Sequence, residues 1–411
     1  MKFIFNSPPE GSQYAKSGSK NIRWFEADNL FAVGRRRNNS RRKFLFISRM
    51  LGKHIEVKPD VVRVAGFLLS CIKYGKDPSP YVSYLKNPDA GEIPAYTPVA
   101  IDQQLVIGFC ETATGLGMAV ASSIEGCCYQ TTTRENIENL PQLLSFEEEH
   151  SHASTHRMFS GKIQLSGFKK LILVDDEITT GKSILNLMRQ IEAVSHMEEY
   201  SILTILDWRD EEQKKAYAAF EKEFHVSIKV YSAADGTITD ESVDDTGYPQ
   251  NETRIPVSSA ESSVFSFSRE TVAVDGKEVM MLSGTGRTGI NYDSIIKTET
   301  EASHAADRIV QVLGTRKKVL VVGHGENIYI PSRVASYLDK YGIDAYFKTT
   351  TLSPVAADGK LISDIAYFYD RGKKYYFYNR NRLELYDAVI LVKDFGDMPV
   401  LCSGGKFSVF Y

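Results

Sequence analysis

Short apolar runs alternate with helical patterns along the first half of the chain. The runs at Leu105–Phe109, Leu171–Val174 and Ser201–Trp208 predict buried strands. After Gly181, apolar residues recur at helical spacing and predict an amphipathic helix over Lys182–Val194. Strands that alternate with helices are typical of a parallel sheet with right-handed crossovers, so the pattern indicates an α/β fold.

The second half of the chain restarts this alternation. Its expected elements are three strands and one helix, in the order Lys318–Gly323, Ile328–Tyr341 (the helix), Ile343–Thr349 and Asp387–Lys393. Between the halves, residues 233–263 are rich in Asp, Ser, Thr and Gly, a composition typical of a domain end and a linker. We therefore predict three segments: a first α/β domain over 1–245, a linker over 246–263 and a second, Rossmann-like α/β domain over 264–411.

The composition is that of a soluble globular protein. The 411 residues are enough for two domains, and a hydrophobic fraction of 43% excludes wholesale disorder. Lys and Arg (49) nearly balance Asp and Glu (52), so the overall charge does not favour nucleic acid as a partner. The five cysteines form no C-x-x-C pair, which argues against a zinc ribbon or a disulfide framework. With no signal-peptide pattern and no apolar run near the roughly 18 residues of a spanning helix, we expect a cytoplasmic protein without a membrane partner.

The sharpest chemical signal is the sequence LILVDDEITTGKS at 171–183. Two adjacent carboxylates, Asp175 and Asp176, follow an apolar strand, and a loop of hydroxyl and glycine residues then leads into the predicted helix. The backbone N–H groups of such a loop and of the helix N-terminus form a cradle for a phosphate. Carboxylates beside that cradle suit sugar hydroxyls or a Mg²⁺ ion near a polyphosphate. A Walker A motif would need a glycine where Asp176 stands, so we reject an ATPase.

This segment resembles the phosphoribosyl-pyrophosphate (PRPP) motif of type I phosphoribosyltransferases. The resemblance implies the type I fold, a parallel sheet flanked by helices and covered by a hood. It implies that Asp175 and Asp176 bind the ribose hydroxyls and, through PRPP, act indirectly on the Mg²⁺ ion. It assigns the 5-phosphate to the loop residues Thr179, Thr180, Gly181, Lys182 and Ser183.

A second turn rich in glycine and hydroxyl residues, IGFCETATGLG at 107–117, ends the preceding apolar run and opens a helical stretch. It resembles the pyrophosphate loop of orotate phosphoribosyltransferase-like enzymes. The resemblance implies that the backbone amides of Gly108, Phe109 and Cys110 contact the diphosphate. Glu111 is either a helix cap or a ligand of a metal-bound water.

Three histidines, His150, His152 and His156, lie in the interval where type I enzymes carry their hood loop. Their spacing is also compatible with zinc, although no cysteine is near, and a solvated polar loop is a third interpretation. Together with Arg134, these histidines are candidates for catalytic contacts to pyrophosphate or to the leaving group.

A basic cluster, RRRNNSRRK at 35–43, precedes the apolar stretch FLFIS and the pair Lys53-His54. These segments resemble the N-terminal signature of a phosphoribosyltransferase subfamily that accompanies bacterial tellurite-resistance gene clusters. The resemblance implies that Arg41, Arg42, Lys53 and His54 border the active site and receive an anionic substrate. A solvated face and a nucleic-acid contact are the alternatives. Trp208, after the third strand, could stack on a base or belong to the core.

The second half resembles the TRSP domain of the same subfamily. Its Thr-Leu-Ser-Pro stretch at 351–354 stands where the family reads Thr-Arg-Ser-Pro, so Leu352 replaces the family arginine. Glycine-rich turns at 284–289 and 323–326 partly match phosphate-binding fingerprints. The candidates for a separate small-molecule site in this half are Gly323, Gly325, Glu326, Ser353 and Arg287, with structural turns as the alternative.

These resemblances imply a Mg²⁺-dependent phosphoribosyltransferase that joins PRPP to a base-like nitrogen acceptor and releases pyrophosphate, or runs the reverse reaction. Its product would be a nucleoside-like metabolite, its partners would be small molecules, and a homodimer is compatible with the resemblance. One alternative is a PRPP-sensing regulatory protein that contacts nucleic acid and has no turnover. A second alternative is a phosphohydrolase that acts through the second domain.

Overall fold

The structure, a computed structural model, describes residues 2–5, 24–37, 43–101, 103–147, 155–243, 247–258, 267–396, 398–401 and 407–410. Within this part of the chain, a seven-stranded sheet forms the centre of the first half, in the order β1-β12-β11-β10-β5-β7-β17. In that order the strands are Lys2–Phe5, Ser227–Asp240, Glu199–Asp207, Lys170–Ile178, Gln104–Gly108, Cys128–Thr131 and Ile290–Asn291. The inner strands run parallel, and β1 and β17 pair antiparallel at the two edges.

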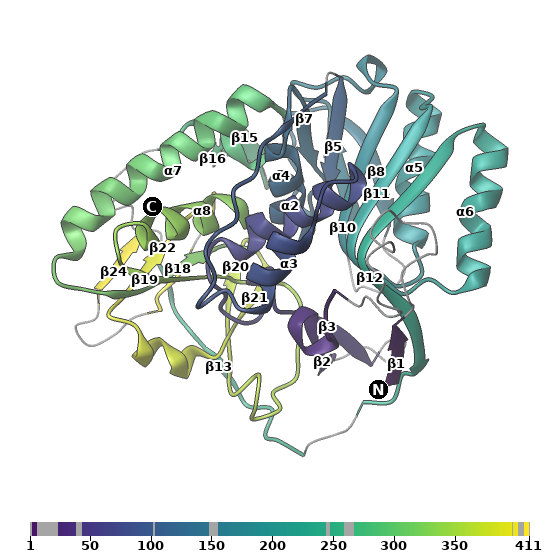
Figure 1. Ribbon diagram of the computed structural model, residues 1–411. Coiled ribbons are helices and arrows are strands. Elements are labelled where there is room, and N and C mark those ends of the chain that lie inside the picture. The colour runs from purple at the N-terminus through teal and green to yellow at the C-terminus, as the bar shows by residue number, and fades with distance from the viewer. Residues whose placement is uncertain are drawn as a thin grey trace.

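Helices cover both faces of this sheet, as expected for parallel strands with apolar side chains on both sides. Figure 1 shows α2 (Val61–Lys73) and α4 (Ala113–Ser122) on one side of the sheet, with α5 (Lys182–Val194) and α6 (Glu211–Phe224) on the other. A further helix, α3 (Ser79–Lys86), packs on α2. The α/β fold class predicted from the sequence is confirmed, and α5 has its predicted bounds.

Two larger sheets and two strand pairs lie in the described part of the second half. In the described residues, the larger has the parallel strands β19 (Asp344–Thr349), β18 (Lys318–Gly323), β22 (Ala388–Leu391) and β24 (Phe407–Phe410). The smaller contains β13 (Glu252–Arg254), β20 (Ile365–Asp370) and β21 (Lys373–Tyr378). The helices of this half are α7 (Tyr292–Leu313) and α8 (Tyr329–Asp339). The succession of β18, α8 and β19 is the Rossmann-like alternation that the sequence predicted.

Short elements complete the described structure. They are α1 (Ala27–Leu30) and the strand pairs β2 (Phe31–Arg35) with β3 (Phe44–Ser48), β4 (Val99–Ala100) with β6 (Ile124–Glu125), β8 (Gln142–Glu147) with β9 (Thr155–Phe159), β14 (Val257–Ser258) with β23 (Met398–Pro399) and β15 (Arg269–Val274) with β16 (Lys277–Leu282). The segment predicted as a linker, 246–263, thus contributes β13 and β14 to pairings within the second half. Both are short edge strands, which need few large apolar side chains and therefore give little hydrophobic signal.

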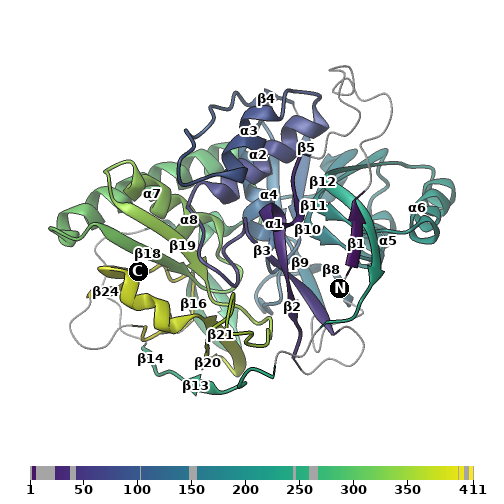
Figure 2. The same ribbon diagram turned by 60° about the horizontal axis from the view of Figure 1, so that its bottom comes forward.

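Backbone pairing joins the two halves of the chain. β17, which follows the predicted linker in sequence, closes one edge of the first sheet by pairing with β7. Val57 and Phe347 form an isolated bridge in which each N–H donates to the carbonyl of the other, at 3.0 and 2.9 Å. A second bridge joins Arg36 to Val355. Figure 2 shows the β2–β3 hairpin between the first sheet and the strands of the second half.

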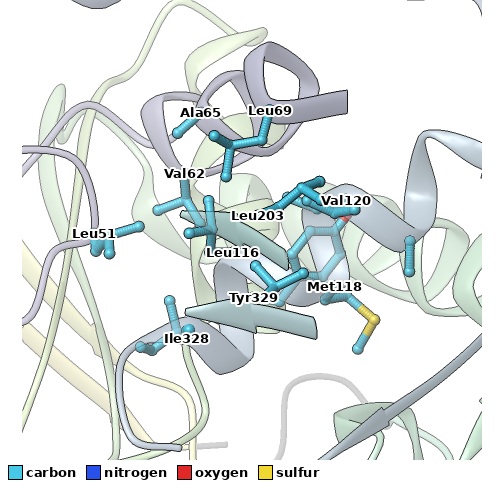
Figure 3. Packing of buried hydrophobic residues seen from close by; sticks show 14 of the residues in the cluster. Leu51, Val62, Ala65, Leu69, Leu116, Met118, Val120, Leu203, Ile328 and Tyr329 are labelled. Atoms are coloured by element: carbon cyan, nitrogen blue, oxygen red, sulfur yellow. The ribbon is translucent and has the colours of Figure 1, made fainter. Parts of the chain in front are cut away.

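A shared hydrophobic core also joins the halves. Figure 3 shows Ile328 at the start of α8 close to Val62 of α2 and Leu116 of α4. A Cβ at Gly115 would lie 2.9 Å from the Ile328 Cβ, so glycine allows α4 to approach this point closely. The two halves therefore form one packed unit.

Candidate active site

A cleft opens where β5 ends and β10 continues. The two strands pair as far as Gly108 and Val174, and the Phe109 N–H donates a further bond of 3.0 Å to the Val174 carbonyl. The chain then turns from β5 into α4, whereas β10 continues beside β11 to Ile178. Such a gap at the carboxyl ends of parallel strands is the place where open α/β sheets bind ligands. The cleft has a volume of about 710 Å³, which is in the range of small-molecule sites.

The acid pair lies within β10, not after it. The apolar run ended the predicted strand at Val174, but β11 continues to pair with β10, so backbone hydrogen bonds extend the strand through the polar residues. Asp175, Asp176 and Glu177 line the cleft and are half-buried. The Asp176 N–H donates to the Asp175 carboxylate at 2.9 Å. The two carboxylates are thus held on a strand and not on a loop.

All five residues of the predicted phosphate loop, Thr179 to Ser183, line the cleft. Gly181 is the N-cap of α5 and has a φ of 74°, a conformation that glycine adopts without strain. The Tyr217 hydroxyl donates to the Gly181 carbonyl at 2.8 Å and supports the turn from behind. α5 begins at Lys182, so the amides of its first turn point from the helix N-terminus, where the helix dipole favours an anion. The Lys182 N–H donates to Thr180 Oγ1 at 3.4 Å.

The second predicted loop, at 108–111, reaches the cleft, but two of its amides are used inside the protein. The Phe109 amide continues the β5–β10 ladder, and the Cys110 N–H donates to Thr132 Oγ1 at 2.9 Å. Gly108 makes room for Tyr129, because a Cβ there would lie 2.7 Å from the Tyr129 hydroxyl. The expected diphosphate contacts of these amides are therefore corrected. The donors at this end of the cleft are the start of α4 and nearby cationic side chains.

Glu111 connects this end of the cleft to the second half. Its side chain is 1% exposed, and its carboxylate lies 3.6 Å from Lys53 Nζ and 3.3 Å from Arg134 Nη1. The carboxylate also accepts hydrogen bonds of 3.1 Å from Thr351 Oγ1 and of 3.1 Å from the Leu352 N–H. Glu111 therefore fixes the Thr-Leu-Ser-Pro stretch against the cleft instead of capping α4.

The cleft has more cationic than anionic side chains. Among the described residues that line it, the eight cations are Arg36, Arg37, Lys53, Arg134, Arg157, Lys182, Lys373 and Lys374, and the four acids are Glu111, Asp175, Asp176 and Glu177. An excess of positive charge in a concave site attracts anionic ligands and suits a substrate with several phosphates.

His54 also lines the cleft and is 2% exposed. Burial, followed by the charges of Lys53 and Lys348, holds the pKa of His54 well below its ordinary value, so the ring is neutral at pH 7. In the described residues, neither ring nitrogen of His54 has a hydrogen-bond partner. His54 therefore lines the cleft but does not add positive charge that could receive an anionic substrate.

Of the predicted hood residues, His156 lines the cleft from β9 and is buried. Its Nδ1 lies 3.4 Å from Cys110 Sγ and 3.3 Å from Thr132 Oγ1. Arg134 lines the cleft as well. Four predicted residues, Arg41, Arg42, His150 and His152, lie outside the described part of the chain.

Trp208 belongs to the core. Its ring lies 5.4 Å from that of Phe5, 5.8 Å from Phe31 and 5.5 Å from Phe46, centroid to centroid, and the residue is buried. The proposed role in stacking on a base is therefore wrong. A strand-end tryptophan beside three phenylalanines is stabilised by aromatic packing.

Most candidates for a separate site in the second half are built into the interface between the halves. The Glu326 carboxylate accepts hydrogen bonds from Thr133 Oγ1 at 2.6 Å, the Arg134 N–H at 2.7 Å and Arg287 Nε at 3.0 Å. Arg287 also pairs with the buried Asp394. Their polar groups are satisfied by each other, so the prediction that they bind a ligand is corrected to a structural role.

The glycines of the same turn act in packing. A Cβ at Gly323 would lie 2.7 Å from Pro331 Cγ, and a Cβ at Gly325 would lie 3.2 Å from the Tyr375 ring. The remaining candidate, Ser353, does line a cleft, but it is the cleft of the first half.

The second half contributes more to this cleft than its sequence indicated. Besides Ser353, its lining residues are Leu352, Pro354, Lys373, Lys374 and Tyr376. The last three lie on β21, where an isolated bridge between Thr351 and Tyr376 brings the two segments together. No local motif marks β21 as functional, since only this tertiary pairing places it at the cleft.

Neither a preformed metal site nor a membrane-spanning helix is found in the described residues. In the described residues, no group of three or more His, Cys, Asp or Glu side chains could hold a metal ion. Among the helices of the described part of the chain, none combines the length and apolarity that a membrane crossing requires.

A carboxylate pair, a glycine-containing loop before a helix and a cationic rim at the carboxyl ends of a parallel sheet are typical of proteins that bind phosphorylated small molecules. A family model described as phosphoribosyl transferase matches residues 30–237, half of the chain. A second model, described as the TRSP domain C-terminal to that domain, matches residues 284–399. The chain belongs to the phosphoribosyltransferase family, carries a TRSP domain and is an enzyme, as its sequence predicted.

The solved structures that match the chain include adenine phosphoribosyltransferases. The enzyme from Trypanosoma brucei is 13% identical, with 51% of this chain and 77% of that chain covered and a TM-score of 0.30. The enzyme from Rhodothermus marinus is 12% identical, with 50% and 94% covered and a TM-score of 0.28. UMP synthase from Leishmania donovani is 9% identical, with 46% and 29% covered and a TM-score of 0.21. No curated protein matches the chain.

Proposed function

We propose that this phosphoribosyltransferase uses PRPP with Mg²⁺ and transfers its phosphoribosyl group to a nitrogen acceptor, with release of pyrophosphate. The observation that carries the proposal is the cleft that brings together the carboxylate pair, the predicted phosphate loop and, beside Glu111, the cations Lys53 and Arg134. A sugar that carries a phosphate at one end and a diphosphate at the other needs these three elements within one small site. The product would be a nucleotide-like phosphoribosyl compound.

PRPP would lie along the cleft from α5 to α4. The 5-phosphate would bind at Thr179–Ser183, at the N-terminus of α5, where the helix dipole favours an anion. The ribose hydroxyls donate to Asp175 and Asp176, which lie directly before this loop. The diphosphate then extends toward the start of α4, where Lys53 and Arg134 lie beside Glu111.

The donor set of the cleft fits Mg²⁺ only as part of a complex with PRPP. Magnesium prefers oxygen ligands and commonly uses one or two carboxylates together with substrate phosphates and water. Asp175 and Asp176 can supply such carboxylates, whereas the described residues contain no complete metal site. When bound, the ion would neutralise charge on the departing diphosphate.

Catalysis would come from positioning and electrostatics, without a covalent intermediate. As the bond between C1 and the diphosphate breaks, positive charge develops on the sugar and negative charge on the leaving group. Lys53 and Arg134 stabilise the leaving diphosphate, and the carboxylates of β10 lie on the side of the sugar. The β8–β9 hairpin carries His156 and Arg157 to the cleft and would help to exclude water.

Neither alternative function has a specific observation in its favour. A phosphohydrolase of the second half would need a separate site, but Arg287 and Glu326 are engaged in ion pairs within the protein. A PRPP sensor would use the same cleft, so it differs from an enzyme only in turnover.

Calorimetric titration of PRPP, with and without Mg²⁺, tests the proposal. Binding should require Mg²⁺ for full affinity and should fall at least about 100-fold, or about 2.7 kcal/mol, in Asp175→Asn/Asp176→Asn. Glu212→Gln, an exposed carboxylate on α6, is the matched control and should bind PRPP as the natural protein does. Absence of PRPP binding to the natural protein, or equal binding to the double variant, would refute the proposal.

A further inference from the structure

We infer that the second half of the chain supplies the acceptor subsite of this cleft, and that the acceptor is a planar nitrogen base that carries a carboxylate. The inference rests on the proposed function, because it assigns the part of the cleft that PRPP leaves open. It gives the TRSP domain a role in the first domain's reaction instead of a site of its own.

Charge is divided unevenly between the two walls of the cleft. Among the described lining residues, all four acids belong to the first half: Glu111 before α4 and Asp175, Asp176 and Glu177 on β10. The opposite wall combines Lys373 and Lys374 of β21 with Arg36 and Arg37 after β2. That wall presents cations and no carboxylate to the cleft, in the residues that the structure describes.

Three cations of this wall form ion pairs with carboxylates outside the cleft. Arg37 and Lys374 both pair with one carboxylate, that of Glu252 on β13. Lys373 shares the Glu135 carboxylate with Arg371, at 2.9 and 3.0 Å, and Arg371 also pairs with Asp370, so this group is balanced. The single Glu252 carboxylate serves two cations, and the positive charge that remains there can be compensated by a ligand anion.

The same wall has apolar surface between its charges. Leu352, Pro354 and Tyr376 line the cleft beside Phe46 of the first half. An aromatic ring and aliphatic side chains suit the faces of a planar base, and the nearby ammonium groups suit an anionic substituent at its edge. Sugar hydroxyls and phosphates would gain little from these apolar groups, so this surface favours the base over PRPP.

Hydrogen bonds place this wall beside the diphosphate end of the cleft. The Arg37 N–H donates to the Pro354 carbonyl at 3.0 Å, which joins the Thr-Leu-Ser-Pro stretch to the β2–β3 hairpin. On its other side, Glu111 accepts from Thr351 Oγ1 and from the Leu352 N–H. An acceptor on this wall is therefore next to the point where the sugar carbon loses its diphosphate, which is where a nitrogen nucleophile must attack.

Leu352 lies on the wall that we assign to the acceptor. The Leu352 side chain adds apolar surface at this position, which suits the ring of a base. The positive charge that would bind the carboxylate of the base comes from Lys374, Arg36 and Arg37.

The test compares pairs of bases that differ in the carboxylate. The full-length protein is loaded with ribose 5-phosphate and Mg-pyrophosphate, and orotate, uracil, nicotinate and nicotinamide are titrated by calorimetry. We expect the carboxylated member of at least one pair to bind about tenfold more tightly than its partner. Lys374→Gln and, as a second variant, Arg36→Gln should each reduce this preference about threefold to fivefold and leave the affinity for Mg-PRPP within twofold.

Lys297→Gln is the matched control, since this exposed lysine lies on α7 away from the cleft. Equal binding within both pairs, including no measurable binding of either member, would overturn the inference. A loss of Mg-PRPP affinity in Lys374→Gln with the preference unchanged would also overturn it, because the wall would then bind the diphosphate. If Mg-PRPP itself does not bind the natural protein, the proposed function fails first, so the two failures are distinct.

Discussion

The two walls of the cleft differ in how the chain builds them. The wall of β10 and the start of α5 comes from one continuous run, residues 171–183, in which strand, carboxylates and phosphate loop follow one another. The wall of the second half comes from the Thr-Leu-Ser-Pro stretch and from β21, which a bridge between Thr351 and Tyr376 brings together. A site encoded in one run depends on local backbone geometry, whereas a site assembled from separate strands depends on the packing of the whole molecule.

The walls also differ in charge. β10 offers carboxylates, which suit hydroxyl donors, and β21 offers ammonium groups, which suit anions. The Glu111 carboxylate contacts residues of both halves. It pairs with Lys53 and Arg134 of the first half and accepts a hydrogen bond from the Leu352 N–H of the second. Variants of the loop, of this connecting carboxylate and of the neighbouring histidine therefore test the comparison at three points.

The largest effect is expected for Gly181→Ala in the phosphate loop. A Cβ would lie 2.8 Å from Tyr217 Cε2 and would also place alanine at a φ of 74°, so the loop must shift away from the geometry that we propose binds the phosphate. We expect the affinity for Mg-PRPP to fall about 100-fold, or about 2.7 kcal/mol, by calorimetry.

Gly342→Ala provides the control for backbone strain alone. Gly342 has a similar φ of 72°, but nothing lies within 4 Å of a Cβ there. This variant should lose about 1 kcal/mol of unfolding free energy and keep its affinity for Mg-PRPP. If Gly181→Ala binds Mg-PRPP as well as Gly342→Ala does, the loop does not hold the phosphate.

A smaller effect, on stability, is expected for Glu111→Gln. The change removes a buried negative charge beside Lys53 and Arg134 but keeps an oxygen that can accept from the Leu352 N–H. The unfolding free energy should fall by about 2 kcal/mol in denaturant titrations, because two cations lose their partner. The affinity for Mg-PRPP should stay the same or rise, since the diphosphate end becomes more positive.

The opposite result for Glu111→Gln would change the assignment. Unaltered stability with a tenfold loss of Mg-PRPP affinity would mean that the carboxylate acts on the ligand, as one of the two sequence-based interpretations held.

The smallest effect concerns the pH dependence of stability at His54. Its pKa in the folded protein lies well below the ordinary 6.5, because of burial and then of Lys53 and Lys348. Below pH 6.5 the unfolded chain binds a proton that the folded protein does not, so stability falls as the pH falls. The stability that is lost therefore grows as the pH falls from 7.5 to 5.5.

His54→Leu should remove that part of the pH dependence in denaturant titrations at pH 7.5 and 5.5. His304→Asn, an exposed position on α7, is the control and should keep the slope of the natural protein. If the slope in His54→Leu is unchanged, folding does not lower the pKa of His54, and the prediction is wrong.

Some parts of the fold and of the cleft could be predicted from the sequence, and others could not. The turn at Gly181 and the helix after it were predictable because Asp175 and Gly181 lie in one run whose pattern of apolar, acidic and glycine residues has a local physical meaning. The length of β10 was not, because its last residues are polar and are held in the strand by β11. Trp208 was ambiguous from sequence, since the neighbours that decide its role, such as Phe31 and Phe46, are distant in the chain.

The role of the second half was the least predictable part of the site. Glu326 and Arg287 looked like ligand-binding residues beside glycine-rich turns, but each satisfies the other's charge. Lys374 and Tyr376 carried no motif, and only the pairing of β21 places them at the cleft. Charge and glycine content alone do not distinguish a buried ion pair from a binding site.

Hydrogen exchange of the full-length protein, with and without Mg-PRPP, tests the central claim most directly. If PRPP is held by the wall of β10 and α5, peptides that cover 175–184 should gain the strongest protection, and those that cover 110–116 should gain protection as well. Peptides that cover 350–354 and 373–376 should gain much less, because that wall remains open for the acceptor. Protection confined to the second half, or no protection at saturating Mg-PRPP, would contradict the account.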